Sequence, residues 1–118
     1  MSAPDDLRSA RTVKHWIASA KLESEPAEQV DKRLSILREF LAHTGRDADG
    51  LVEYCFLRKK DTGERFSSVK RRGEVDDWIE EFVEHNGWTG KDAVVNGNIV
   101  RSFMIHNGAV IQGRAWRG

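Results

Sequence analysis

Histidine and cysteine are the side chains of this 118-residue chain that could bind a metal, and it has four histidines and one cysteine. His43, His85 and His106 all fall in the same motif, Phe-x-x-His-x-Gly. A cation in the last turn of a helix, followed by a glycine that ends the helix, has this spacing. His15 has no histidine or cysteine partner at a metal-binding spacing. We therefore expect neither a metal site nor a cofactor.

Serines and paired carboxylates could support catalysis, but their surroundings favour structural roles. Ser67 and Ser68 precede an amphipathic segment and are interpreted as helix caps. The six acidic residues from Glu74 to Glu84 have the spacing of the outer face of a helix. The sequence contains no Gly-x-Ser-x-Gly, P-loop or dinucleotide-binding motif. We expect no catalytic residues and no enzymatic activity.

Basic residues are the third set of candidates, because they are concentrated although the net charge is zero. Seven Lys and Arg residues lie between Arg58 and Arg72, against two acidic residues, and the acidic stretch follows directly. A basic loop that leads into a helix can bind phosphate, since lysine and arginine displace counterions and the helix start adds backbone amides. Alternatively, the basic and acidic stretches only neutralise each other.

The candidate contacts fall into two groups. The expected phosphate contacts are Lys59, Lys60, Lys70, Arg71 and Arg72, and Lys91 is a further expected DNA-binding residue. The expected groove contacts lie on the polar side of the last helix, at Asn96, Asn98 and Arg101. Asparagine and arginine can read base edges in the major groove of DNA. Polar residues at these positions are also typical of any exposed helix face, which is the alternative interpretation.

Hydrophobic periodicity predicts an all-α fold whose helices position these side chains. The expected helices are Leu7–Leu22, Pro26–His43, Asp47–Arg58, Ser67 or Ser68 to Asn86, and Thr89–Gly108. Residues 58–66 are expected to form a loop, with a short β-hairpin as the alternative. Asp47 or Asp49 is expected to cap the third helix and Thr89 the last one. Within the last helix, Gly97 indicates either a close helix–helix approach or a shorter helix.

Length and composition indicate a single domain. We expect a flexible tail at residues 1–7, a helical domain at 8–112 and a C-terminal tail at 113–118. No stretch approaches the roughly 20 apolar residues needed to cross a bilayer, so no membrane association is expected. The N-terminus lacks the apolar core of a signal peptide, and the single Cys55, expected to be buried, suits a reducing compartment. These features favour a cytoplasmic location.

Two short motifs lie in the second and the last expected helix. Residues 37–41 read LREFL, and residues 98–103 read NIVRSF. Together with the order of the helices, these motifs resemble the N-terminal SAM-like, core-binding domain of tyrosine recombinases, a group that includes phage integrases. The resemblance covers about residues 10–111.

The resemblance implies a compact four- to five-helix SAM-like bundle that grips one side of double-stranded DNA. It also implies a recombinase catalytic domain, in the same chain or in another one. The sequence has no room for the family's catalytic constellation of an arginine, a His-x-x-Arg motif and a nucleophilic tyrosine, and its single tyrosine, Tyr54, lies in an apolar run. The expected function is therefore double-stranded DNA binding without catalysis. The alternative is a helical protein-interaction module whose acidic helix face meets a basic partner.

Overall fold

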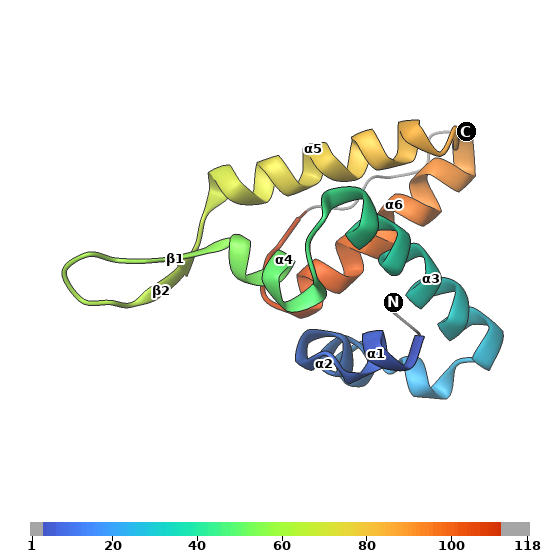
Figure 1. The fold of residues 1–118 in the computed structure, drawn as a ribbon, viewed down its shortest axis with the longest axis horizontal. Coiled ribbons are helices and arrows are strands. Elements are labelled where there is room, and N and C mark those ends of the chain that lie inside the picture. The colour runs from blue at the N-terminus through green and yellow to red at the C-terminus, as the bar shows by residue number, and fades with distance from the viewer. Residues whose placement is uncertain (1–3, 112–118) are drawn as a thin grey trace.

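The computed structural model of the protein describes residues 4–111 (Figure 1). Its elements are, in chain order, α1 Pro4–Ser9, α2 Arg11–Ser19, the 3-10 helix η1 Leu22–Ser24, α3 Ala27–Thr44, α4 Ala48–Tyr54, β1 Phe56–Arg58, β2 Arg65–Ser67, α5 Val69–His85 and α6 Gly90–His106. The expected all-α class is confirmed, with one small hairpin added to a bundle of helices.

The centre of the bundle is formed by α3, α5 and α6, each of which packs against the other two. On α5, Val75, Ile79 and Phe82 recur at helical spacing and are buried. Phe82 meets Phe40 of α3 edge to face, with 5.3 Å between ring centroids, a geometry that aromatic pairs prefer. The end of α6 lies beside the start of α5, so these two helices run antiparallel (Figure 1).

The expected first helix, Leu7–Leu22, is wrong because the chain changes direction twice within it. Ala10 has an extended backbone, with φ −64° and ψ 135°, and separates α1 from α2. Lys21 adopts the left-handed conformation, with φ 56°, and separates α2 from η1. Apolar spacing continues through both bends, so the periodicity alone does not reveal them.

Part of the segment expected to be a tail, residues 1–7, is helical. α1 begins at Pro4, and Leu7 is buried in the core. A proline fits the first turn of a helix, where no amide donor is needed, and burial of Leu7 holds that turn against the bundle. Residues 1–3, like the expected C-terminal tail at 113–118, lie outside the described residues.

The segment after α4 corrects two expectations, a helix that continues to Arg58 and a loop at residues 58–66. α4 ends at Tyr54, and β1 and β2 then pair as an antiparallel hairpin. The amide of Ser68 donates to the carbonyl of Cys55 at 2.7 Å and closes the base of the hairpin. Strands of three residues are too short to show alternation in the sequence. The hairpin that we kept as the alternative is therefore confirmed.

The expected helix ends are confirmed for α3, α5 and α6. His43, His85 and His106 all lie in the last turn of their helices. Gly45 and Gly87, which follow α3 and α5, have φ values of 72° and 70° that favour glycine. The recurring Phe-x-x-His-x-Gly motif is thus a repeated way of ending a helix.

The expected caps are confirmed at two helix starts and are not formed at a third. Asp47 accepts a hydrogen bond from the amide of Gly50 at 2.6 Å and caps α4. Ser68 accepts one from the amide of Arg71 at 3.2 Å and caps α5. Thr89 occupies the N-cap position of α6, but its side chain makes no cap hydrogen bond.

Cys55 is fully buried, which confirms the expected structural role of this residue. Burial raises the pKa of its thiol to about 11. Since the thiolate is the reactive form, the side chain behaves as a small apolar group. Across residues 4–111, no helix is long and apolar enough to span a membrane.

Candidate nucleic-acid interface

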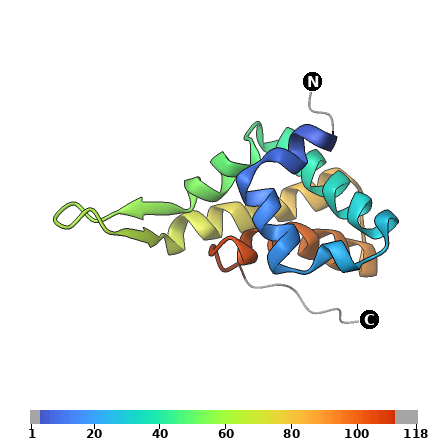
Figure 2. The ribbon, with the colours of Figure 1, turned by 90° about the horizontal axis from the view of Figure 1, so that it is seen from below.

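The hairpin and the first turn of α5 project from the bundle as a single arm (Figure 2). We call residues 56–72 the basic arm. Its basic side chains are Arg58, Lys59, Lys60, Arg65, Lys70, Arg71 and Arg72. The closed base of the hairpin brings its two strands and the start of α5 together, so the seven basic residues share one end of the molecule.

Two arginines face each other across the hairpin, since Arg58 on β1 pairs in register with Arg65 on β2. Like charges at opposed positions destabilise a pair of strands. The repulsion between the two arginines is partly offset because Arg58 donates to the carbonyl of Gly63 at 3.0 Å. Arg65 forms an ion pair with Glu53 at 2.8 Å and lies 3.6 Å from the centroid of the Phe56 ring. The contact of Arg58 leads toward the turn of the hairpin, and that of Arg65 leads toward α4.

The three lysines of the basic arm are its most accessible charges. Lys59 lies 3.7 Å from Glu64, and both side chains are largely exposed, so this ion pair contributes little. Lys60 and Lys70 are exposed, and neither has an ion-pair partner among the described residues. These side chains can approach a phosphate without first breaking a strong internal contact.

Arg71 and Arg72 are half-buried and have structural contacts. Arg71 donates to the carbonyl of Tyr54 at 3.3 Å and lies 4.6 Å from the centroid of the same residue's ring. Arg72 donates to the carbonyl of Val110 at 2.9 Å and ties the chain after α6 to the start of α5. Arg72 is therefore less available to a ligand than the lysines, whereas Arg71 keeps several of its donors.

Lys91 is not brought together with the basic arm. It is the second residue of α6, and the preceding helix α5 separates it from the arm. The 17 residues of α5 span about 25 Å at 1.5 Å per residue. Lys91 is exposed, but it lies at the opposite end of α5 from the basic arm and is not part of the same surface.

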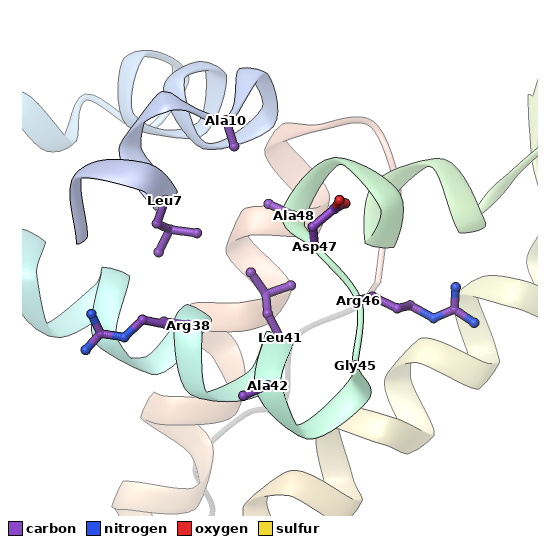
Figure 3. Close-up of a pocket in the computed structure, with 9 residues that line it drawn as sticks. All are labelled: Leu7, Ala10, Arg38, Leu41, Ala42, Gly45, Arg46, Asp47 and Ala48. Carbon is purple, nitrogen blue, oxygen red and sulfur yellow. The ribbon is translucent and has the colours of Figure 1, made fainter. Parts of the chain in front are cut away.

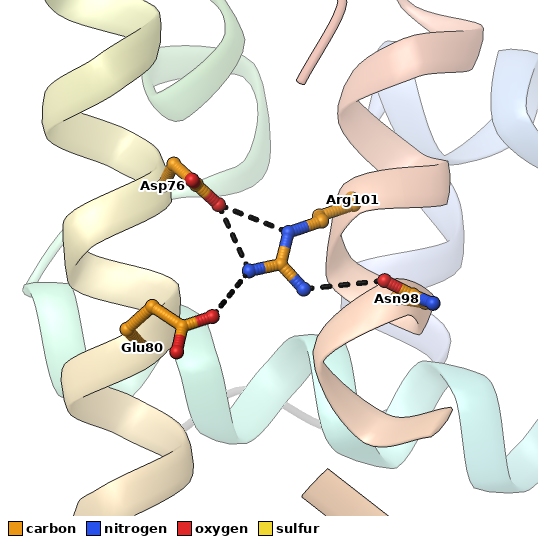
Figure 4. A network of polar contacts seen from close by, with 4 residues as sticks. All are labelled: Asp76, Glu80, Asn98 and Arg101. Carbon is orange, nitrogen blue, oxygen red and sulfur yellow. Dashed lines mark hydrogen bonds and ion pairs between the residues drawn. The ribbon is translucent and has the colours of Figure 1, made fainter. Parts of the chain in front are cut away.

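Arg101 is wrong as an expected groove contact, because it is buried between α5 and α6 (Figure 4). Its side chain is 2% exposed. Nε donates to Asp76 at 2.9 Å, and Nη2 donates to Glu80 at 2.6 Å. Nη1 donates to the side-chain oxygen of Asn98 at 3.2 Å. The guanidinium thus joins two helices instead of facing solvent.

The other two expected groove contacts on α6 are also partly or fully covered. Asn96 is buried, and Asn98 is half-buried beside the Arg101 guanidinium. A Cβ atom at Gly97 would come within 2.9 Å of Arg101 Nη1 and 3.5 Å of Val83 on α5. Of the two alternatives for Gly97, the close helix–helix approach is therefore confirmed, and the glycine leaves the space that the guanidinium occupies.

The acidic run of α5 is divided between two environments. Glu74 accepts a hydrogen bond from the hydroxyl of Tyr54, which is the main cause of a raised Tyr54 pKa. Asp76 and Glu80 bind Arg101. The remaining three acids, Asp77, Glu81 and Glu84, are exposed. Only half of the run therefore has the solvent-facing role that its spacing predicts.

Sequence reasoning did not identify Arg46, Tyr54 and Trp78 as a cluster. The guanidinium carbon of Arg46 lies 4.4 Å from the centroid of the Tyr54 ring and 5.3 Å from that of Trp78. The ring centroids of Tyr54 and Trp78 are 5.2 Å apart. These residues come from the α3–α4 connection, α4 and α5, so no local pattern in the sequence brings them together.

An apolar groove of about 440 Å³ lies between α1, the end of α3 and the start of α4 (Figure 3). Leu7, Leu41 and Ala48 point into it, whereas Arg38 and Arg46 point to opposite sides away from it. The carboxylate of Asp47, which also lines the groove, caps α4. The groove offers apolar contact and no converging charges.

The histidines do not assemble a metal site within residues 4–111, where no group of three or more potential ligands is placed to hold an ion. His43 and His85 lie at neighbouring helix ends, with 5.6 Å between their ring centroids. His106 Nδ1 forms a hydrogen bond with the hydroxyl of Ser19 at 2.8 Å. The helix ends thus account for the positions of these three side chains.

Three comparisons with known proteins complete the description of the chain. No known protein family, curated protein or solved structure matched it. The charge and geometry of the described residues therefore carry the functional argument.

Proposed function

We propose that this protein binds double-stranded DNA through the basic arm and does so without catalysing a reaction. The observation that supports this proposal is the projecting arm, in which Lys60 and Lys70 are exposed and have no ion-pair partner among the described residues. Unpaired cations on a protruding element can neutralise phosphates and release counterions. A two-stranded ribbon also fits the major groove of B-form DNA.

The proposal extends to the role that the sequence resemblance implies. The chain would serve as the core-binding part of an integrase-like or recombinase-like protein, with a catalytic domain in the same or another chain. A cytoplasmic location is part of the proposal, and a single free cysteine, Cys55, is compatible with it.

A helical protein-interaction module is the second candidate. Asp77, Glu81 and Glu84 are exposed at spacings of four and three residues and form an acidic stripe on α5. Such a stripe could meet a basic protein. Its three charges are fewer than the full acidic run suggests, because the other acids bind within the protein.

A titration of a short DNA duplex, followed by fluorescence anisotropy at several salt concentrations, tests the first proposal. The logarithm of the affinity should fall by about 0.9 per phosphate contact for each unit of log salt concentration. Replacing Lys59, Lys60 and Lys70 by alanine should reduce the magnitude of this slope by about 2.7. Circular dichroism should show that the triple variant keeps its helices.

Two results count against DNA binding by the arm. One is the absence of duplex binding by the wild-type protein at low salt. The other is a triple variant that binds the duplex with wild-type affinity and salt dependence. Binding of a basic protein that is lost when Asp77, Glu81 and Glu84 become neutral would instead support the second candidate.

A further inference from the structure

The ring of Tyr54 holds two arginine side chains where the basic arm joins the bundle. The guanidinium carbons of Arg46 and Arg71 lie 4.4 Å and 4.6 Å from its centroid. Arg46 also lies 5.3 Å from the centroid of Trp78. Contacts of this length are cation–π interactions. They bring together two positive charges that are separated by 25 positions in the sequence and would otherwise repel each other.

Each member of this cluster is held by the fold. Gly45 ends α3 in the left-handed conformation, and the amide of Arg46 donates to the carbonyl of Leu41 at 3.3 Å. The hydroxyl of Tyr54 donates to Glu74, which fixes the ring relative to α5. Since Arg71 lies in the first turn of α5, the cluster ties three segments together.

The two guanidinium groups keep free hydrogen-bond donors. No carboxylate among the described residues forms an ion pair with Arg46 or Arg71. Arg71 donates to one protein acceptor, the carbonyl of Tyr54. A cation–π contact holds a guanidinium by its face, whereas its N–H groups point outward in the plane. Such a group is positioned to bind a phosphate with two parallel hydrogen bonds.

Arg101 shows what the same side chain does in a structural role. Its donors are taken by Asp76, Glu80 and Asn98, and it is buried. Arg46 differs in both respects, because it is exposed and its guanidinium lies over aromatic rings without an ion-pair partner. It also lines a pocket of about 290 Å³, together with His43, Thr44, Trp78 and Glu81. Glu81 is not within ion-pair distance of Arg46.

We propose that Arg46 and Arg71, held on the ring of Tyr54, form a second phosphate-binding site that receives the DNA backbone where the basic arm joins the bundle. The inference rests on the proposed DNA binding and adds Arg46, a residue outside the arm, to the contact surface. Tyr54 and Trp78 act as positioning residues because they orient the guanidinium of Arg46. The backbone of a duplex held by the arm then continues along the side of the bundle formed by α4 and α5.

Three variants separate the charge of Arg46 from its geometry. Arg46→Ala should weaken duplex binding about fivefold and reduce the salt slope by about 0.9, because one phosphate contact is lost. Arg46→Lys should keep the salt slope but weaken binding about twofold to threefold, since lysine cannot make two parallel hydrogen bonds. Arg38→Ala is the matched control, as its side chain points away from that of Arg46 (Figure 3), and it should bind as the wild type does.

NMR gives a direct measurement that a loss of stability would not imitate. The Nε–Hε signal of Arg46 should shift on addition of the duplex, with the same apparent affinity as anisotropy. A mononucleotide should not shift this signal at equal phosphate concentration. A shift at that concentration would indicate a site for free phosphate. It would contradict the proposal that this site receives the DNA backbone.

The outcomes distinguish this inference from the proposed function. If the triple lysine variant loses binding while Arg46→Ala binds like the wild type, the second site is wrong and binding by the arm stands. If wild-type protein fails to bind the duplex, both proposals are wrong. If Arg46→Ala and Arg38→Ala weaken binding equally, the loss comes from the lower net positive charge of the protein and not from a contact at Arg46. The second site is then again wrong.

Discussion

The basic arm and α6 both contain basic side chains expected to contact DNA, but the fold surrounds these charges differently. Lys70 is exposed at the start of α5 and has no ion-pair partner among residues 4–111. Arg101 is 1% exposed and donates to three side chains. Charge that is satisfied inside the protein stabilises the packing of two helices. Charge that remains unsatisfied at the surface is available to a ligand.

The difference comes from what lies opposite each cation. Asp76 and Glu80 are one helical turn apart on α5 and face α6, so both carboxylates reach the same guanidinium (Figure 4). The arm has no such partner helix, since it projects beyond the bundle (Figure 2). A mutation in α6 should therefore change stability, whereas a mutation in the arm should change binding.

The largest effect should follow from Arg101→Ala. Removal of the guanidinium leaves two carboxylates close together and a cavity between α5 and α6. We expect the free energy of unfolding to fall by about 3 kcal/mol. Urea denaturation followed by circular dichroism measures this loss. An unchanged stability together with weakened DNA binding would contradict the structural role of Arg101.

Gly97→Ala should have a smaller effect on the free energy of unfolding, and the sign of this effect should depend on whether Arg101 is present. The added methyl group would approach Arg101 Nη1 at 2.9 Å, so we expect a loss of about 1 kcal/mol despite the better helix propensity of alanine. In the Arg101→Ala background, the same substitution should be stabilising by about 1 kcal/mol. Gly73→Ala is the control, because no atom lies within 4 Å of its added Cβ, and it should stabilise α5. Equal effects of Gly97→Ala in both backgrounds would be inconsistent with this packing.

An effect of similar size at neutral pH, which shrinks in acid, should follow from Thr12→Val. The Thr12 hydroxyl donates to Asp49 at 2.6 Å, and this hydrogen bond is the largest cause of the lowered Asp49 pKa. A lowered pKa in the folded state stabilises the protein above the unfolded-state pKa, and the benefit is lost as pH falls through the folded-state value. Thr12→Val should therefore cost about 1 kcal/mol at neutral pH and less in acid. Urea denaturation at both pH values measures the difference, and a cost that does not shrink in acid would count against this linkage.

The helical part of the fold could be predicted from the sequence because its signals are local. The stripe on α5 and the recurring Phe-x-x-His-x-Gly motif placed the main helices and their ends correctly. The bend at Ala10 could not be placed, since it does not interrupt the apolar pattern, and the hairpin was only the alternative to a loop at residues 58–66. Strands of three residues carry too little alternation to compete with a helix signal.

The candidate site could be predicted only where its residues are close in the sequence. The lysines of the basic arm lie within a short stretch and were identified from charge alone. The buried state of Arg101 depends on acids about 20 to 25 positions away on a facing helix. Arg46 becomes part of a site only because Tyr54 and Trp78 come beside it in space. The sequence does contain Asp76 and Glu80 at i, i+4 spacing and Arg101 on another helix, but their pairing is a tertiary contact.

Two matched lysines test the central claim most directly. Lys70 and Lys91 are each the second residue of a helix and are both exposed, but only Lys70 belongs to the basic arm. In a duplex titration at low salt, Lys70→Ala should weaken binding about fivefold, or roughly 1 kcal/mol, and Lys91→Ala should leave it unchanged. Equal losses for the two variants, or a larger loss for Lys91→Ala, would contradict DNA binding by the basic arm.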